Sequence, residues 1–426
     1  LRSYEVDAKK GFLPARDPLK RLTQTEYLIW EDVADELPKF LGVRFPQVRE
    51  VLLNIPKLST ENLTTRAELE RAHFLLALFA HSFVWGGFPI LDYIPENIAV
   101  PLCEVSRRLE VPPLLCYFDI VLNNWRRLDD AAVISMGNLA TLNNFFDGRD
   151  ESWFYLITVE IEYLGARAVA PLYQLTRDLT RISKDDIDLS DLQFIKLVDN
   201  TTLVLLKIAE VIASMTESMS HMREGCDPYI FFHRVRPFLA GWKRNPAVPN
   251  GVRYLGVKNV FGGEQDTLSS LKSKVIPGVE QFPYQQFSGG SAAQSTLLPF
   301  FDILLGVDHS EHDASPASNS FLRSMRAFMP RGHRAFLEHI EDCASLRPFI
   351  LAEGTETNSV DKLLSQYDEC LKNMAAFRGS HMKLVAEYII AQQKNGTPSK
   401  NTIGATAGGK GTGGTDLMKF LRPIRE

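Results

Sequence analysis

The chain has 426 residues, of which 45% are hydrophobic and 23% charged, as in an ordinary globular protein, and this composition excludes a largely disordered chain. Its 47 Lys and Arg residues against 52 Asp and Glu residues leave a net charge of -5, so nothing in the charge favours nucleic acid as a partner. The five cysteines form no CxxC pair, which favours free thiols in a reducing compartment over disulfides or a zinc site. With no apolar run of about 18 residues and no signal-peptide profile, we expect a cytoplasmic protein without a membrane segment.

Apolar residues recur at a spacing of about 3.6 through most of the sequence, which predicts an all-α protein. Ser59 or Thr60 is the expected cap of the first long helix, and Gly86 its expected end. The predicted helices, in chain order, cover residues 59–85, 101–110, 114–127, 153–179, 189–224, 228–242, 292–306, 321–329, 333–344 and 361–393.

A change of composition at residues 143–151 is the clearest candidate for a domain boundary. It predicts a smaller, mostly helical N-terminal domain, residues 1–146, and a larger helical domain, residues 147–426. Short extended pieces near residues 252–260 and before Asp119 stay open alternatives to helix.

The predicted helix at residues 361–393 carries a histidine, His381, on its apolar stripe. A lone histidine there is usually a core residue bonded to a carbonyl. The alternative is an axial haem ligand, which needs a neutral imidazole in an apolar wall. Gly379 and Arg378 favour the alternative. A glycine inside a helix costs about 1 kcal/mol relative to alanine and indicates close approach by something flat or bulky. An arginine can pair with an anionic group such as a propionate.

The segment FFHRVR at residues 231–236 joins aromatic rings to guanidinium groups. Phe232 and Arg236 are four residues apart and therefore share a helical face. A ring wall beside a carboxylate clamp suits a ligand that is both aromatic and anionic. The alternative is a helix with core phenylalanines and solvated arginines.

Two other patterns are weaker evidence for a functional site. His309 and His312 lie in the polar loop 308–320, for which a solvated loop is favoured over a metal site. GATAGGKG at residues 404–411 approaches a phosphate-binding loop, but Gly411 stands where a Ser or Thr would coordinate magnesium. No predicted strand precedes it, so nucleotide binding is rejected.

Several long segments, in order along most of the chain, resemble the indoleamine 2,3-dioxygenase family. They include PENIAVPLCEVSRRLEVPPLLCYFDIVLNNW (95–125), ESWFYLITVEIE (151–162), FFHRVRPFLAGWKRNP (231–246), FSGGSAAQS (287–295), FDILLGVDHS (301–310), MPRGHRAFL (329–337), RGSHMKLVAEYI (378–389) and KGTGGTDLMKFL (410–421). The segment WFYLITVEIE is more similar to the fungal branch of the family than to the vertebrate one.

The resemblance implies an all-helical enzyme whose larger domain holds haem b and whose N-terminal domain covers the distal side. Such enzymes insert both atoms of O2 into the C2–C3 bond of the L-tryptophan indole and give N-formylkynurenine, the first step of the kynurenine pathway. The resemblance further implies a monomer with L-tryptophan and O2 as its only partners.

The resemblance also implies roles for individual residues. His381 matches the proximal ligand of the haem iron, Arg236 the clamp on the substrate carboxylate, and Arg378 with Asp302 the pair near a haem propionate. The residues that match the substrate-binding wall and the loops over haem and substrate are Tyr117, Phe154, Thr158, Phe231, Phe232, Ser291, Ala292 and Thr412, of which Ser291 also belongs to the haem contacts.

One matched position departs from the vertebrate pattern. Thr158 stands where vertebrate members carry a serine, and its added methyl group stiffens the rotamer and puts substrate affinity in question. The matched residues include no histidine or carboxylate that can act as an acid or base on the distal side. The chemistry is therefore expected on the haem iron, with the protein supplying orientation and a dry cavity.

Two rivals to the enzyme hypothesis stay open. One is a protein that binds O2 on the same scaffold without turnover, and the other is a regulatory protein that acts through a partner. Arg236 and the GTGGT sequence favour the enzyme, because an oxygen carrier needs neither.

The glycine-rich stretch at residues 404–415 gives a first prediction. The resemblance places Thr412 over the substrate, and Gly413 and Gly414 would supply the backbone freedom for closure. Thr412→Ala and Gly413→Ala should each lower turnover with tryptophan and leave the haem spectrum and melting temperature nearly unchanged. Steady-state kinetics and limited proteolysis with and without tryptophan check this. Normal kinetics with equal cleavage rates would make the stretch a mere tether.

Overall fold

A computed structural model describes residues 1–43, 47–184, 191–262, 281–307, 316–343, 346–351 and 358–395. Helices dominate this part of the chain, and each of its strands has only two or three residues, which confirms the all-α prediction. None of the helices in these ranges is long and apolar enough to cross a membrane.

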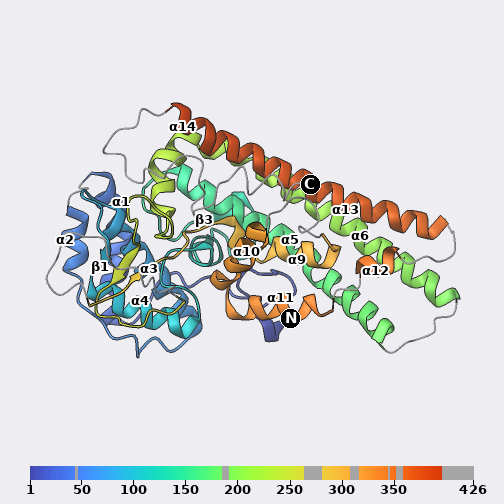
Figure 1. The fold of residues 1–426 in the computed structure, drawn as a ribbon, viewed down its shortest axis with the longest axis horizontal. Coiled ribbons are helices and arrows are strands. Elements are labelled where there is room, and N and C mark those ends of the chain that lie inside the picture. Colours follow the sequence, from blue (N-terminus) through green and yellow to red (C-terminus); the bar gives the residue numbers. More distant parts are fainter. Residues whose placement is uncertain are drawn as a thin grey trace.

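The N-terminal helices gather at one end of the molecule (Figure 1). They are α1 (Leu28–Gly42), α2 (Val48–Leu53), α3 (Arg66–Trp85) and α4 (Glu96–Leu109), preceded by the 3₁₀ turns η1 (Arg2–Tyr4) and η2 (Thr25–Tyr27). Helix α3 is buried along most of its length. It begins later than predicted, because Thr65 and Glu68 form a capping box, whereas Ser59 and Thr60 lie outside the helix.

Three long helices run side by side through the rest of the molecule (Figure 1). Helix α6 (Asp191–Ser220) packs against both α5 (Arg149–Lys184) and α13 (Asn358–Val385). The shorter helical elements are η4 (Phe118–Leu122), η5 (Met136–Asn138), α7 (Met222–Gly225), α8 (Pro228–Ile230), η6 (Phe231–Val235), η7 (Arg236–Leu239), η8 (Ala292–Gln294), α9 (Leu297–Leu305), α10 (Pro316–Met325), η9 (Arg326–Phe328), α11 (Arg331–Glu341), α12 (Leu346–Leu351), η10 (Ala386–Ile390) and α14 (Ala391–Asn395).

Two predicted helices are wrong in extent. Between residues 114 and 127 the only helical element is the short π-helix η4, and the segment ends in extended residues at Arg126 and Arg127, which pair with Leu139 and Ala140. At the start of η4, the Asp119 carboxylate accepts the Cys116 backbone N–H and contacts the His73 ring. The predicted helix at residues 228–242 is three short pieces, α8, η6 and η7. Pro237, in the first turn of η7, has no N–H to continue a helical hydrogen-bond ladder.

The strands form two small sheets. Strand β4 (Val252–Tyr254) pairs parallel with β1 (Tyr93–Ile94) and antiparallel with β5 (Tyr284–Gln285). Strand β2 (Arg126–Arg127) pairs antiparallel with β3 (Leu139–Ala140). The extended alternative near residues 252–260 is therefore correct for the first three residues of that range.

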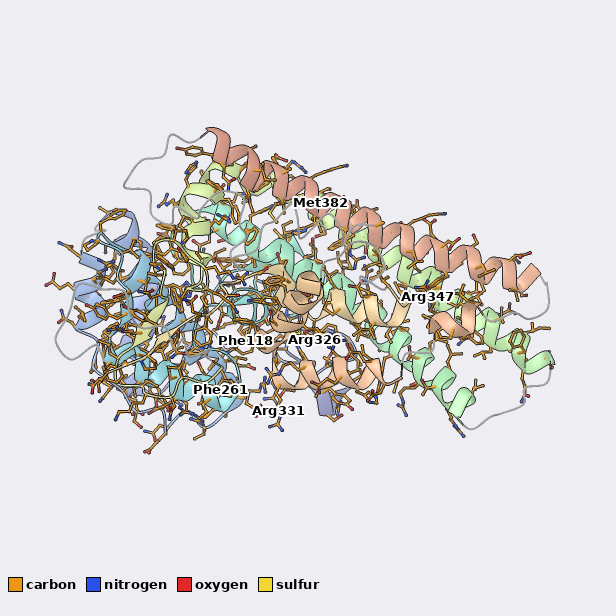
Figure 2. The ribbon with its side chains drawn as sticks, viewed as in Figure 1. Phe118, Phe261, Arg326, Arg331, Arg347 and Met382 are labelled. Atoms are coloured by element: carbon orange, nitrogen blue, oxygen red, sulfur yellow. The ribbon has the colours of Figure 1, made fainter. Side chains whose placement is uncertain are left out.

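Residues before the predicted boundary at 146/147 contact residues after it. The His81 ring on α3 bonds the Phe238 carbonyl at 2.7 Å. The N-terminal turn η1 packs on α11, and Arg331, which Figure 2 labels on α11, pairs with Glu110 at 2.7 Å. The division into domains 1–146 and 147–426 stays a prediction.

Glu151 anchors the chain where the N-terminal part leads into α5. Its buried carboxylate accepts the backbone N–H groups of Phe145 and Phe146 at 2.9 and 2.8 Å and the Tyr155 hydroxyl at 3.0 Å. Burial raises the pKa of Glu151 to about 7, although these hydrogen bonds act in the opposite direction.

The second prediction follows from this pKa. Between the ordinary value of 4.5 and about 7 the folded protein holds a proton on Glu151 that the unfolded chain has lost, so its contribution to stability declines as pH rises through this window. Glu151→Gln cannot titrate and should flatten the pH dependence of the unfolding free energy there. Urea unfolding at several pH values tests it, with the exposed Glu224→Gln as control. The same slope in all three proteins would contradict the raised pKa.

Candidate functional site

His381 lies on the apolar stripe of α13 and is half-buried, as Leu371 is. The buried members of that stripe include Tyr367, Cys370, Met374, Phe377 and Leu384, and Tyr388 follows in η10. In the part of the chain that the structure describes, no residue forms a hydrogen bond with the His381 imidazole, which speaks against a core histidine bonded to a carbonyl. Desolvation nevertheless lowers the pKa of His381, so its ring is neutral at pH 7 and can act as a metal ligand. Met382, which follows His381 on α13, marks this part of the helix in Figure 2.

The surroundings of His381 leave room for a large group. A Cβ atom added at Gly379 would meet no described atom within 4 Å, so this side of α13 is open rather than packed. Arg378, next to it, pairs with Asp302 of α9, and the side chains are only 11% and 16% exposed. The structure thus joins the pair that the sequence predicted.

Aromatic rings continue from this region toward α5. The Phe231 ring lies 5.9 Å from Tyr388 and 4.4 Å from Phe154, measured between ring centroids. The Arg236 guanidinium lies over the Phe232 ring at 5.5 Å, although the two belong to different helical pieces. Phe154 and Phe232 are half-buried, so part of each side chain lies outside the packed core.

Arg236 is only 2% exposed, and burial lowers its pKa to about 10. It therefore keeps its positive charge at neutral pH. Its positive charge lies beside the Phe232 ring, an arrangement that suits binding of an aromatic ligand with a carboxylate. The alternative of solvated arginines holds only for Arg234, which is exposed.

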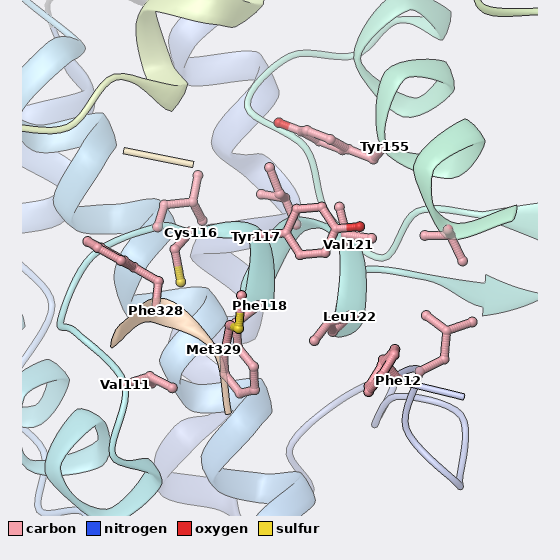
Figure 3. Packing of buried hydrophobic residues seen from close by; sticks show 14 of the residues in the cluster. Phe12, Val111, Cys116, Tyr117, Phe118, Val121, Leu122, Tyr155, Phe328 and Met329 are labelled. Carbon is pink, nitrogen blue, oxygen red and sulfur yellow. The ribbon is translucent and has the colours of Figure 1, made fainter. Parts of the chain in front are cut away.

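Tyr117 is buried among hydrophobic side chains (Figure 3), and it makes a contact that the sequence analysis missed. Its hydroxyl donates to the Glu162 carboxylate at 2.6 Å, and the Ser295 hydroxyl donates to the same oxygen at 2.6 Å. Glu162 is 1% exposed. Glu162 shares a face of α5 with Phe154 and Thr158 at four-residue spacing. That spacing was the signal available in the sequence.

The remaining predicted residues are placed as follows. Thr158 is half-exposed, and its hydroxyl donates to the Phe154 carbonyl at 3.1 Å within α5. Ser291 caps η8 and Ala292, its first residue, is exposed. Thr412, His309, His312 and the stretch 404–411 lie outside the described residues. The predicted loop 308–320 is wrong in its last part, because α10 begins at Pro316. No cluster of three metal-binding side chains occurs within the described ranges.

These contacts form a contact chain in two parts, which helix α5 connects. One part joins Tyr388 of η10, the element that follows α13, to Phe231 and Phe154, and the other part joins Glu162 to Tyr117 and Ser295. The sequence model of the family described as indoleamine 2,3-dioxygenase matches residues 1–426. The chain belongs to the indoleamine 2,3-dioxygenase family.

Curated relatives agree with this membership. The chain is 33% identical to indoleamine 2,3-dioxygenase 2 of Homo sapiens over all of its own length and 94% of the human protein. It is 31% identical to indoleamine 2,3-dioxygenase of Saccharomyces cerevisiae, over all of this chain and 92% of the yeast protein. A 6-hydroxytryptophan 2,3-dioxygenase of Fusarium equiseti is also 31% identical, with 100% and 96% of the two chains covered. The predicted resemblance is confirmed, and the family is one of haem-dependent dioxygenases.

The residues around His381 fit the haem that membership in the indoleamine 2,3-dioxygenase family implies. A neutral imidazole lies half-buried on the apolar stripe, the Gly379 side of the helix is open, and the Arg378 cation lies alongside. This is the donor set that iron in a porphyrin requires from the proximal side, together with a partner for an anionic propionate.

Proposed function

We propose that this chain uses haem b to open the C2–C3 bond of the L-tryptophan indole with O2, giving N-formylkynurenine and supplying the first step of the kynurenine pathway. The observation that carries the proposal is the group of aromatic contacts that joins η10, which follows the helix of His381, to η6 and α5, with the Arg236 guanidinium over the Phe232 ring. His381 would hold the haem iron, with Arg378 and Asp302 near a propionate and Ser291 on the loop above. The haem supplies the activation of O2 when bound.

The protein itself binds and orients the substrate. Arg236 holds the tryptophan carboxylate by charge-assisted hydrogen bonds, and Phe232 supplies a ring beneath the guanidinium. Phe154 and Phe231 form a wall for the indole, which restricts its orientation and excludes water. Thr158 and Ala292 add contacts to this wall, and Thr412 closes over the substrate.

The proposal extends to the setting of the enzyme. The domain of residues 1–146 covers the distal side of the haem-binding domain, 147–426, and the protein works as a monomer in the cytoplasm. Five free cysteines, Cys103, Cys116, Cys226, Cys343 and Cys370, support a reducing compartment.

An optical assay tests the activity directly. The haem-loaded, reduced protein is mixed with L-tryptophan and O2, and N-formylkynurenine is followed by its absorbance. Product formation supports the enzyme, whereas an O2 complex that forms without product would support the oxygen-binding rival.

The third prediction concerns the haem ligand. His381→Ala removes the imidazole from the open position on α13 and should abolish stable haem incorporation or remove the strong axial bond. Haem content and the Soret band of the purified variant measure this. His221→Ala is the matched control, because that side chain is 43% exposed and lies on α7's edge, outside the contact chain. A normal Soret band and full activity in His381→Ala would reject the ligand assignment.

The fourth prediction concerns the carboxylate clamp. A hydrogen bond to a charged group contributes about 1.5–3 kcal/mol, so Arg236→Ala should raise the Michaelis constant for L-tryptophan roughly tenfold or more with normal haem content. Arg236→Lys should restore only part of the affinity, since lysine lacks the bidentate fork. The exposed Arg234→Ala serves as control. Unchanged tryptophan kinetics in Arg236→Ala would remove this residue from the site.

A further inference from the structure

Glu162 is a buried carboxyl group near the site that the proposed substrate contacts do not use. Its Oε1 atom accepts two short hydrogen bonds, from the Tyr117 and Ser295 hydroxyls, each at 2.6 Å. Its Oε2 atom is buried and has no hydrogen-bond partner among the described residues. Among the described residues no cation pairs with it, and burial raises the pKa of Glu162. Burying a carboxyl group without a cation is costly, so its retention in the interior calls for a reason other than stability.

The two donors bring together parts of the molecule that are far apart in sequence. Tyr117 immediately precedes η4, in the part of the chain before the predicted boundary, and Ser295 closes the turn η8 that starts at Ser291. Glu162 lies on α5, two helical turns beyond Phe154. The carboxyl group therefore joins the start of η4, the 288–295 loop and the face of α5 that carries Phe154 and Thr158.

A second contact ties the same two segments to each other. The Gln294 side-chain carbonyl accepts the Tyr117 backbone N–H at 3.0 Å, and its amide donates to the Gly289 carbonyl at 3.0 Å. On the other side of Tyr117, the Asp119 carboxylate accepts the Cys116 backbone N–H at 2.8 Å and contacts the buried His73 ring at 2.6 Å. The backbone of Tyr117 is thus fixed from both sides, and Glu162 fixes its ring.

Burial also raises the pKa of Tyr117 well above its ordinary value, so the phenol keeps its proton and acts as the donor. In either protonation state of Glu162, Oε1 can accept both hydroxyl groups. An uncharged acceptor of the same shape would therefore preserve the arrangement.

We infer that Glu162 is a positioning residue of the substrate site, which sets the place of Tyr117 and of the loop bearing Ser291 and Ala292 relative to Phe154 and Thr158 on α5. The inference rests on the proposed function, because it deepens the account of how the same site recognises an indole amino acid. Glu162 touches no reacting atom in this scheme and acts only through Tyr117 and Ser295.

The test compares two carboxylates of the same helix. Glu160 also accepts hydrogen bonds from two other elements, from the Met136 backbone N–H at 2.9 Å and the Ser218 hydroxyl at 2.6 Å, but lies outside the contact chain. Glu162→Leu should raise the Michaelis constant for L-tryptophan about tenfold with normal haem content, and Glu162→Gln should stay within about twofold of the wild type, because the amide carbonyl keeps Oε1. Glu160→Leu should leave tryptophan kinetics unchanged even if it lowers the melting temperature.

Two further readouts do not depend on turnover. Equilibrium binding of L-tryptophan, followed by the haem absorption spectrum, should weaken in Glu162→Leu by the same factor as the Michaelis constant. The C–O stretching frequency of carbon monoxide bound to the reduced protein should shift in Glu162→Leu and not in Glu160→Leu, since it reports on groups facing the ligand. If Glu162→Leu fails to fold, Tyr117→Phe and Ser295→Ala each delete one hydrogen bond and should each weaken tryptophan binding, with a combined effect different from the sum.

The outcomes distinguish a failure of the proposed function from a failure of the positioning role. A wild-type protein that forms no N-formylkynurenine rejects the proposed function. An active wild type with unchanged tryptophan affinity in Glu162→Leu, or in both Tyr117→Phe and Ser295→Ala, rejects the positioning role alone. Equal losses in Glu162→Leu and Glu160→Leu would also reject it, because a general structural role predicts that result.

Discussion

The packing of α13 against α6 is the interaction on which the rest of the site depends. It buries most of an apolar stripe that runs from Tyr367 to Leu384 and fixes the rotation of the helix. The His381 imidazole lies on this stripe and is partly exposed, next to the open side of the helix at Gly379. A small rotation of α13 would bury the ring in the core or turn it to bulk solvent.

Irregular helix geometry places several of the residues matched to the site. Three π-helices occur in the described ranges, η4, η6 and η10, and each adjoins a site residue: Tyr117 precedes η4, Phe231 and Phe232 lie in η6, and Tyr388 lies in η10. A π-turn adds a residue to the helical repeat and redirects the side chains that follow it. Such turns are found often at functional sites, since a regular helix would point these rings elsewhere. The local cost of the poorer geometry is compensated by the packing on both sides.

The site also contains buried ionisable groups, which are rare in a hydrophobic core. Arg236 and Glu162 are both nearly inaccessible, and their pKa values move in the directions that disfavour charge. The two groups do different work. The guanidinium suits direct recognition of a carboxylate, whereas the carboxyl group holds two hydroxyl-bearing segments together. Burial strengthens both interactions, because competing water is absent.

Local pattern in the sequence determined the helical class and two parts of the site. The spacing of apolar residues predicted the α13 stripe with His381 on it, and the four-residue step from Phe232 to Arg236 predicted a ring beside a guanidinium, because both features need only helical periodicity. Long ordered similarities then indicated the family. Tertiary structure alone decided which side of His381 stays open, where the helices at residues 114–127 and 228–242 break, and that Tyr117 meets Glu162. These outcomes rest on contacts between residues far apart in the chain, 177 positions for Tyr117 and Gln294 and 133 for Glu162 and Ser295, and no local periodicity encodes such pairings.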